Sequence, residues 1–134
     1  MSTSVLLRYS RGLKWKGDNG FTVNGGNQGD DNSVDLVLDI GDRLDKDATK
    51  YNIYFVGLVN QIRCNKRLQK DIKIKSPVID VVDGRVTFPL PLELTKYGIT
   101  YMAYLKSADD DTTGKTVVSD IFHLVIKPTP GFRL

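Results

Sequence analysis

Apolar and polar residues alternate along much of the chain, the pattern of strands that bury one side and expose the other. The clearest case is residues 34–40, where Asp35 and Asp39 separate valine, leucine and isoleucine. Residues 51–56 are β-branched and aromatic, and the isoleucines of residues 72–74 alternate with charged neighbours. All three segments are therefore predicted to be strands.

A tight turn is predicted where Asp83 and Gly84 separate two apolar runs, residues 78–82 and 86–90. Aspartate and glycine both tolerate the positive φ that a type I′ turn requires. The pattern therefore predicts a β-hairpin at this point.

Strands are also expected at residues 99–105 and 117–126, joined by the polar loop 107–115. Residues 17–33 are rich in glycine, asparagine and aspartate, and so predict loop around one short strand at Phe21 to Val23. Helix is confined to a turn or so at residues 92–97, with Pro91 suited to its start.

Many short strands separated by turn residues predict an all-β sandwich or barrel. Tyr101 lies near the start of a late strand, where the tyrosine of an immunoglobulin-like sandwich bonds back to the preceding corner; a plain core aromatic is the alternative. We predict an immunoglobulin-like antiparallel β-sandwich with a Gly-rich N-terminal loop region. It forms one domain over residues 1–134, with its core at about 18–127, a flexible N-terminal arm and a Pro/Gly tail.

Composition narrows the function classes. The 134 residues suit one domain, the net charge of +3 is small, and no apolar run approaches the roughly 20 residues of a membrane helix. We expect no membrane partner. The single cysteine, Cys64, cannot form an internal disulfide, so packing alone must hold the fold.

The sequence has few of the residue patterns that form a catalytic, phosphate-binding or metal-binding site. The one histidine, His123, lies within a predicted strand, and nothing in the spacing brings it near Cys64. Gly114-Lys115-Thr116 lacks the earlier glycine of a phosphate-binding loop, and the acidic clusters lack calcium-loop spacing. We therefore expect no enzyme, no catalytic residue, no metal site and no cofactor.

Two clusters of basic residues could bind either nucleic acid or a neighbouring copy of the chain. Basic residues interleaved with an aromatic suit nucleic acid, but acidic loops nearly balance the charge and no nucleic-acid motif is present. Pairing with acidic loops of a neighbouring copy is favoured, solvated surface charges with no specific role are the alternative, and no nucleic-acid partner is expected. The clusters are Arg63, Lys66, Arg67 and Lys70, and Arg8, Arg11, Lys14 and Lys16 around Trp15.

The succession of motifs resembles the N-terminal domain of upper baseplate proteins from tailed phages, a β-sandwich family also met in fibre-like virion proteins. The resemblance covers residues 18–127 and rests on the segments 27–33, 83–86, 97–105 and 122–126. It implies docking onto a baseplate or similar platform. Members usually continue into a trimerising stalk, whereas residues 128–134 hold no heptad, so a decoration or fibre-anchoring adaptor is expected rather than receptor binding.

We therefore expect a phage virion structural protein, assembled in the host cytoplasm as a homo-oligomer, trimer or higher, with other virion proteins as partners. The expected interface residues are Trp15, Phe21, Phe132 and Arg133, although Trp15 and Phe21 can instead close the core. The alternative is a carbohydrate- or cell-surface-binding module that uses Trp15 with the Tyr51/Tyr54 pair. An enzyme relying on His123 or Cys64 ranks last.

Overall fold

The computed structural model describes residues 3–10, 14–41, 48–63, 66–108 and 116–131, with backbone only at 61–63 and 66–68. Within these residues lie ten strands and one short helix. They are β1 (Thr3–Tyr9), β2 (Trp15–Lys16), β3 (Thr22–Asn27), β4 (Val34–Asp39), β5 (Lys50–Arg63), β6 (Lys66–Lys75), β7 (Ile79–Asp80), β8 (Arg85–Pro89), α1 (Leu92–Thr95), β9 (Thr100–Ser107) and β10 (Phe122–Lys127). No helix in this described part of the chain is long and apolar enough to cross a membrane.

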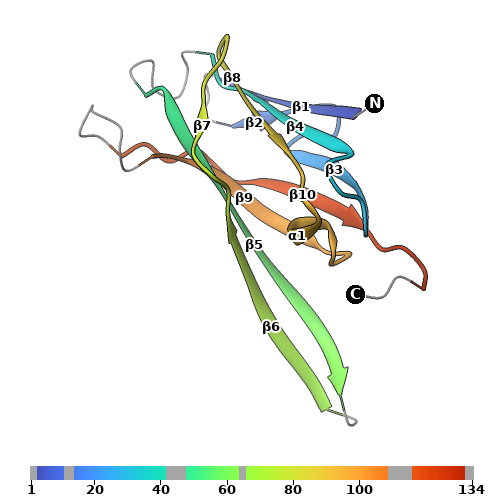
Figure 1. The fold of residues 1–134 in the computed structure, drawn as a ribbon. Helices are drawn as coiled ribbons and strands as arrows, with labels where there is room; N and C mark the ends of the chain where they lie inside the picture. The colour runs from blue at the N-terminus through green and yellow to red at the C-terminus, as the bar shows by residue number, and fades with distance from the viewer. Residues whose placement is uncertain (1–2, 11–13, 42–47, 64–65, 109–115, 132–134) are drawn as a thin grey trace.

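The strands form two sheets packed face to face, so the prediction of an all-β sandwich is confirmed (Figure 1). The smaller sheet has the order β2-β1-β4-β8, and the larger has the order β3-β10-β9-β5-β6, with β7 also paired to β5. Both sheets are mixed rather than wholly antiparallel, because β1 runs parallel to β4 and β3 runs parallel to β10. In both cases the chain visits the other sheet between the two partners, which removes the need for a tight hairpin.

The predicted alternation places the core. Val34, Leu36 and Leu38 of β4 are buried while the residues between them are partly exposed, as their sequence pattern predicts. The opposing sheet contributes Phe55 and Tyr101, which meet edge to face with ring centroids 6.2 Å apart. Burial of these large apolar side chains on both inner faces is the main stabilising contribution to the fold.

The N-terminal segment is not a flexible arm, and this prediction is corrected. β1 lies between β2 and β4 in the smaller sheet, with Leu7 and Tyr9 buried. The core therefore begins well before residue 18. This strand is hard to predict from the sequence, because apolar and polar residues alternate only weakly from Thr3 to Tyr9 and its main partner, β4, is about 30 residues away.

The Asp83-Gly84 turn forms, with φ of 52° and 73° at its two central residues. It is flanked by a single bridge between Val82 and Arg85, and the expected hairpin goes no further. β7 pairs with β5 and β8 pairs with β4, so the turn carries the chain from one sheet to the other.

Helix α1 and the Tyr101 corner also follow the sequence prediction. Pro91 precedes the helix, and the Tyr101 hydroxyl donates to the Leu94 carbonyl oxygen at 2.7 Å. The loop at residues 27–32 holds the helix from the other side. Leu92 N–H donates to the Asp31 carboxylate, and the Gln28 side-chain amide donates to the Lys96 carbonyl.

A two-stranded arm is the largest feature that sequence reasoning missed. The β5–β9 pairing ends at Val56, opposite Met102, yet β5 continues to Arg63 and stays paired with β6 throughout. We call residues 57–72 the arm. Figure 1 shows it extending away from the rest of the sandwich as a narrow ribbon.

Candidate interaction surfaces

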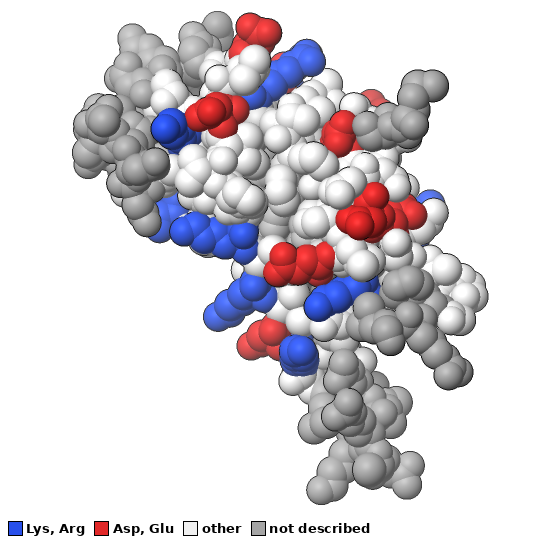
Figure 2. All heavy atoms as spheres, viewed as in Figure 1, with Lys and Arg blue, Asp and Glu red and all other residues white. Residues whose placement is uncertain are grey.

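The arm carries the charge imbalance of the whole chain. It holds four basic residues and one acidic residue, a net charge of +3, which equals the net charge of the full sequence. The rest of the chain therefore holds 15 basic and 15 acidic residues. Figure 2 shows both signs interspersed over the viewed face. The arm's charged residues are Arg63, Lys66, Arg67, Lys70 and Asp71.

The base of the arm is anchored by a close approach at Gly57. A Cβ atom there would lie 2.7 Å from Ile99 Cδ1 and 2.9 Å from Tyr101 Cδ1. Ile72, directly opposite Gly57, is buried. The arm is thus fixed where it leaves the sandwich, while Leu58, one residue further, is already 47% exposed.

A second surface, the apolar patch, lies on the outer side of the larger sheet. We define it as Phe21, Met102 and Ile121, which are 50%, 49% and 45% exposed. They line a hollow of about 440 Å³ together with Lys14, Trp15, Asp120 and His123. Exposed apolar side chains gathered around a hollow are typical of interaction sites.

His123 belongs to the rim of this patch. Phe122 and Leu124 are buried, and His123 between them is half-buried on the outer side, as its place in the strand predicts. Its ring meets Phe21 edge to face, with centroids 4.9 Å apart. His123 thus packs against an aromatic ring at the surface, while Cys64 lies outside the described residues.

An aromatic stack lies on the same outer face. The Tyr54 and Tyr104 rings lie parallel, with centroids 5.2 Å and planes 8° apart. The Lys75 and Lys106 ammonium groups lie 5.7 Å and 5.8 Å from the Tyr54 centroid. These cation–π contacts and the stack hold the four side chains against the sheet.

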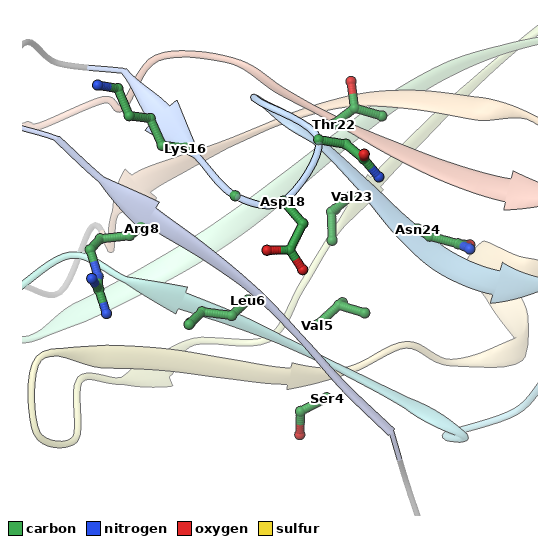
Figure 3. A pocket seen from close by; sticks show the side chains of 11 residues that line it. Ser4, Val5, Leu6, Arg8, Lys16, Asp18, Thr22, Val23 and Asn24 are labelled. Carbon is green, nitrogen blue, oxygen red and sulfur yellow. The ribbon is translucent and has the colours of Figure 1, made fainter.

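A hollow of about 450 Å³, with both polar and apolar walls, lies between β1 and β3 (Figure 3). The Asp18 side chain points toward its middle, while Ser4 of β1 and Thr22 of β3 line its sides. The one carboxylate in this lining supplies neither a nucleophile–base pair nor the ligand set of a cation. Elsewhere, too, the described residues hold no group of three or more His, Cys, Asp or Glu that could bind a metal.

Arg8, at one end of this hollow, is engaged in the smaller sheet. Its Nε lies 3.3 Å from Asp39 Oδ2, and Arg85 Nε reaches the same oxygen at 4.0 Å. The three residues are aligned across β1, β4 and β8, so the cross-strand register produces this ion-pair row. Arg8 and Arg85 are largely exposed, and such pairs stabilise weakly.

The four predicted interface residues have different places. Trp15 is 2% exposed, its indole N–H donates to the Asp120 carbonyl at 2.8 Å, and its ring packs against Tyr9 and Phe122. It closes the core and presents almost no surface. Phe21 is exposed, in the apolar patch. Phe132 and Arg133 lie outside the described residues.

The sugar-binding constellation does not form. Trp15 and Tyr51 are both buried, so neither ring face is open to a sugar, and only Tyr54 lies on the outer face. Local sequence left Trp15 open to either place, because its burial depends on the pairing of β2 with β1. Met102 and Ile121 of the apolar patch were missed for a related reason: the patch joins one residue of β9 to the segments that precede β3 and β10.

Two comparisons with known proteins add no family. No protein-family model matches the sequence, and no curated protein matches it either.

Proposed function

We propose that the chain is a phage virion structural protein, a baseplate, tail or capsid-fibre adaptor that assembles through protein–protein contacts. The observation that carries this proposal is the apolar patch: Phe21, Met102 and Ile121 are each about half exposed around one hollow. Aromatic residues and methionine are enriched in protein interfaces, where they become buried on contact. The motif resemblance supplies the virion context.

The proposed partners are other virion proteins and further copies of this chain, brought together in the host cytoplasm. The projecting arm supports this role, because a two-stranded ribbon alone in water is marginally stable and gains from contact with a neighbour. A non-enzymatic role is part of the proposal.

A carbohydrate-binding module is less favoured. Of the three aromatic residues expected to bind a sugar, Trp15 and Tyr51 are buried and Tyr54 lies on the outer face. Tyr54 is stacked on Tyr104, and the Lys75 and Lys106 ammonium groups lie against its ring. Stacking of a sugar there would require these side chains to leave.

Immunogold labelling of purified phage particles, with antibodies raised against this chain, tests the virion assignment. We expect gold at a repeated position on the tail or capsid. Particles that remain unlabelled, while the same antibodies detect the denatured protein in the infected cell, would overturn the assignment.

The apolar patch is tested with a matched pair of variants on β9. Met102 and Thr100 are both exposed and two positions apart, but only Met102 lines the hollow. In cells that produce the particles, tagged wild type and Thr100→Asp are expected to co-purify with them, whereas Met102→Asp is expected to be lost. Equal recovery of both variants would show that the patch is not the contact.

A further inference from the structure

The arm has an open backbone edge on its β5 side. The Ile53 carbonyl accepts from the Ser76 N–H at 2.8 Å, so the backbone N–H and C=O groups of Ile53 point toward the β6 side, in the plane of the sheet. These groups alternate in direction along a strand, and those of Leu58, Asn60 and Ile62 therefore point toward the opposite side. No strand of the described residues pairs with them there, because β9 pairing ends at Val56.

The two edges of the arm differ in charge. Residues 57–62 of β5 are Gly-Leu-Val-Asn-Gln-Ile and carry no charge. In β6, six of the ten residues are charged, and all but Asp71 are basic. Charged residues, especially lysine, are a common means of protecting an edge strand from further pairing. The β6 edge is protected in this way, and the β5 edge is not.

We propose that the β5 edge of the arm pairs antiparallel with the same edge of a second copy of this chain. The inference rests on the proposed assembly function, for which it names one partner and one contact. With the two-fold axis at Asn60, Leu58 lies opposite Ile62 of the partner subunit. The backbone N–H and C=O groups of Leu58, Asn60 and Ile62 then form hydrogen bonds with the partner strand. The two arms then make one sheet in the order β6-β5-β5-β6.

The charge distribution favours this pairing over contact through β6. Neighbouring strands lie about 4.8 Å apart, so the two β6 strands would be about 14 Å from each other. This exceeds the screening length of about 8 Å at physiological salt, so their repulsion is weak. A symmetric contact is self-complementary and closes as a dimer.

Disulfide trapping tests the geometry with a matched control. Asn60 and Gln69 lie directly opposite each other within the hairpin, and both are exposed. In a Cys64→Ser background, Asn60→Cys should form an intermolecular disulfide on mild oxidation, because its Cα would lie about 5.5 Å from that of the partner. Gln69→Cys should remain uncrosslinked. No crosslink at either position, or equal crosslinking at both, would overturn the proposal.

Sedimentation equilibrium over a wide concentration range gives an independent measurement. We expect wild type to dimerise, Asn60→Lys to weaken dimerisation by about tenfold or more, and Gln69→Lys to leave it nearly unchanged. Circular dichroism checks that each variant is folded. A wild type that stays monomeric, or a dimer insensitive to Asn60→Lys, would overturn the proposal.

Other occupants of the arm give different results. An acidic protein or nucleic acid would contact the basic residues of β6, so its binding would fall with Lys70→Ala and survive Asn60→Lys; that outcome contradicts the pairing. Gold-labelled particles with a monomeric protein would refute only the arm pairing. A dimer trapped at Asn60, with unlabelled particles, would refute only the virion role.

Discussion

The Tyr101 hydroxyl donates to the Leu94 carbonyl oxygen at 2.7 Å, and both residues are completely buried. This bond joins the start of β9 to the last turn of α1, seven residues earlier in the chain. Loss of a buried donor leaves its acceptor without a partner, which costs more than the bond itself contributes. The Tyr101 hydroxyl therefore helps to hold the backbone between α1 and β9 in place.

Tyr101→Phe removes only that hydroxyl. We expect the free energy of unfolding to fall by about 1 to 2 kcal/mol, measured by urea denaturation. Tyr104→Phe, which changes the half-buried tyrosine on the outer face of the same strand, is the control and should change stability by less than about 0.5 kcal/mol. Equal effects of the two substitutions would contradict the importance of the corner.

The same hydroxyl predicts a pH dependence. Burial raises the pKa of Tyr101 well above its ordinary value, and the nearby Tyr97 and Glu93 add to the rise. The folded state therefore keeps the proton when the unfolded state begins to lose it, near pH 10. Stability contributed in this way is complete below pH 10 and is lost as the pH rises further.

The measurement is the difference in free energy of unfolding between wild type and Tyr101→Phe at several pH values. The other tyrosines ionise in both proteins, so the difference isolates Tyr101. It should be constant from pH 7 to 9 and shrink above about pH 10. A difference that stays constant or grows above pH 10 would contradict the direction of the pKa shift.

Gly98 predicts a steric effect at the entry to β9. A Cβ atom there would lie 2.6 Å from Pro128 Cα, a backbone atom that cannot turn aside as a side chain can. Gly98→Ala should therefore lower the free energy of unfolding by about 1 to 3 kcal/mol. Thermal or urea unfolding measures this, with Thr100→Ala at a nearby exposed position as the control. A neutral Gly98→Ala would mean that the segment after β10 shifts freely.

Local chemistry made part of the fold predictable. The apolar alternation of β4, the Asp83-Gly84 turn and the bond from Tyr101 each depend on residues close together in sequence. The pairing of the strands on either side of the Asp83-Gly84 turn was not predictable, because β7 pairs in one sheet and β8 in the other. Local propensity does not determine which strands pair.

The arm escaped prediction for a similar reason. Residues 66–71 are almost wholly polar, with no apolar alternation, and their strand is defined by pairing with β5. Only one of the three residues of the apolar patch was named from the sequence. Phe21 was named among the interface candidates, but Met102 and Ile121 join it only because β9 and β10 lie side by side. Trp15 is a large aromatic that the sequence could place either in the core or at an interface.

The pairing of β3 with β10 has a consequence for synthesis. Thr22 lies opposite His123, so about a hundred residues separate the two strands in the chain. As the chain leaves the ribosome, β3 emerges about a hundred residues before β10, its only strand partner among the described residues. The larger sheet cannot close until β10 has been made, and long-range pairings of this kind form slowly. The residues around β3 are Gly-rich and polar, and a segment with few apolar side chains is less prone to aggregate while it is still unpaired.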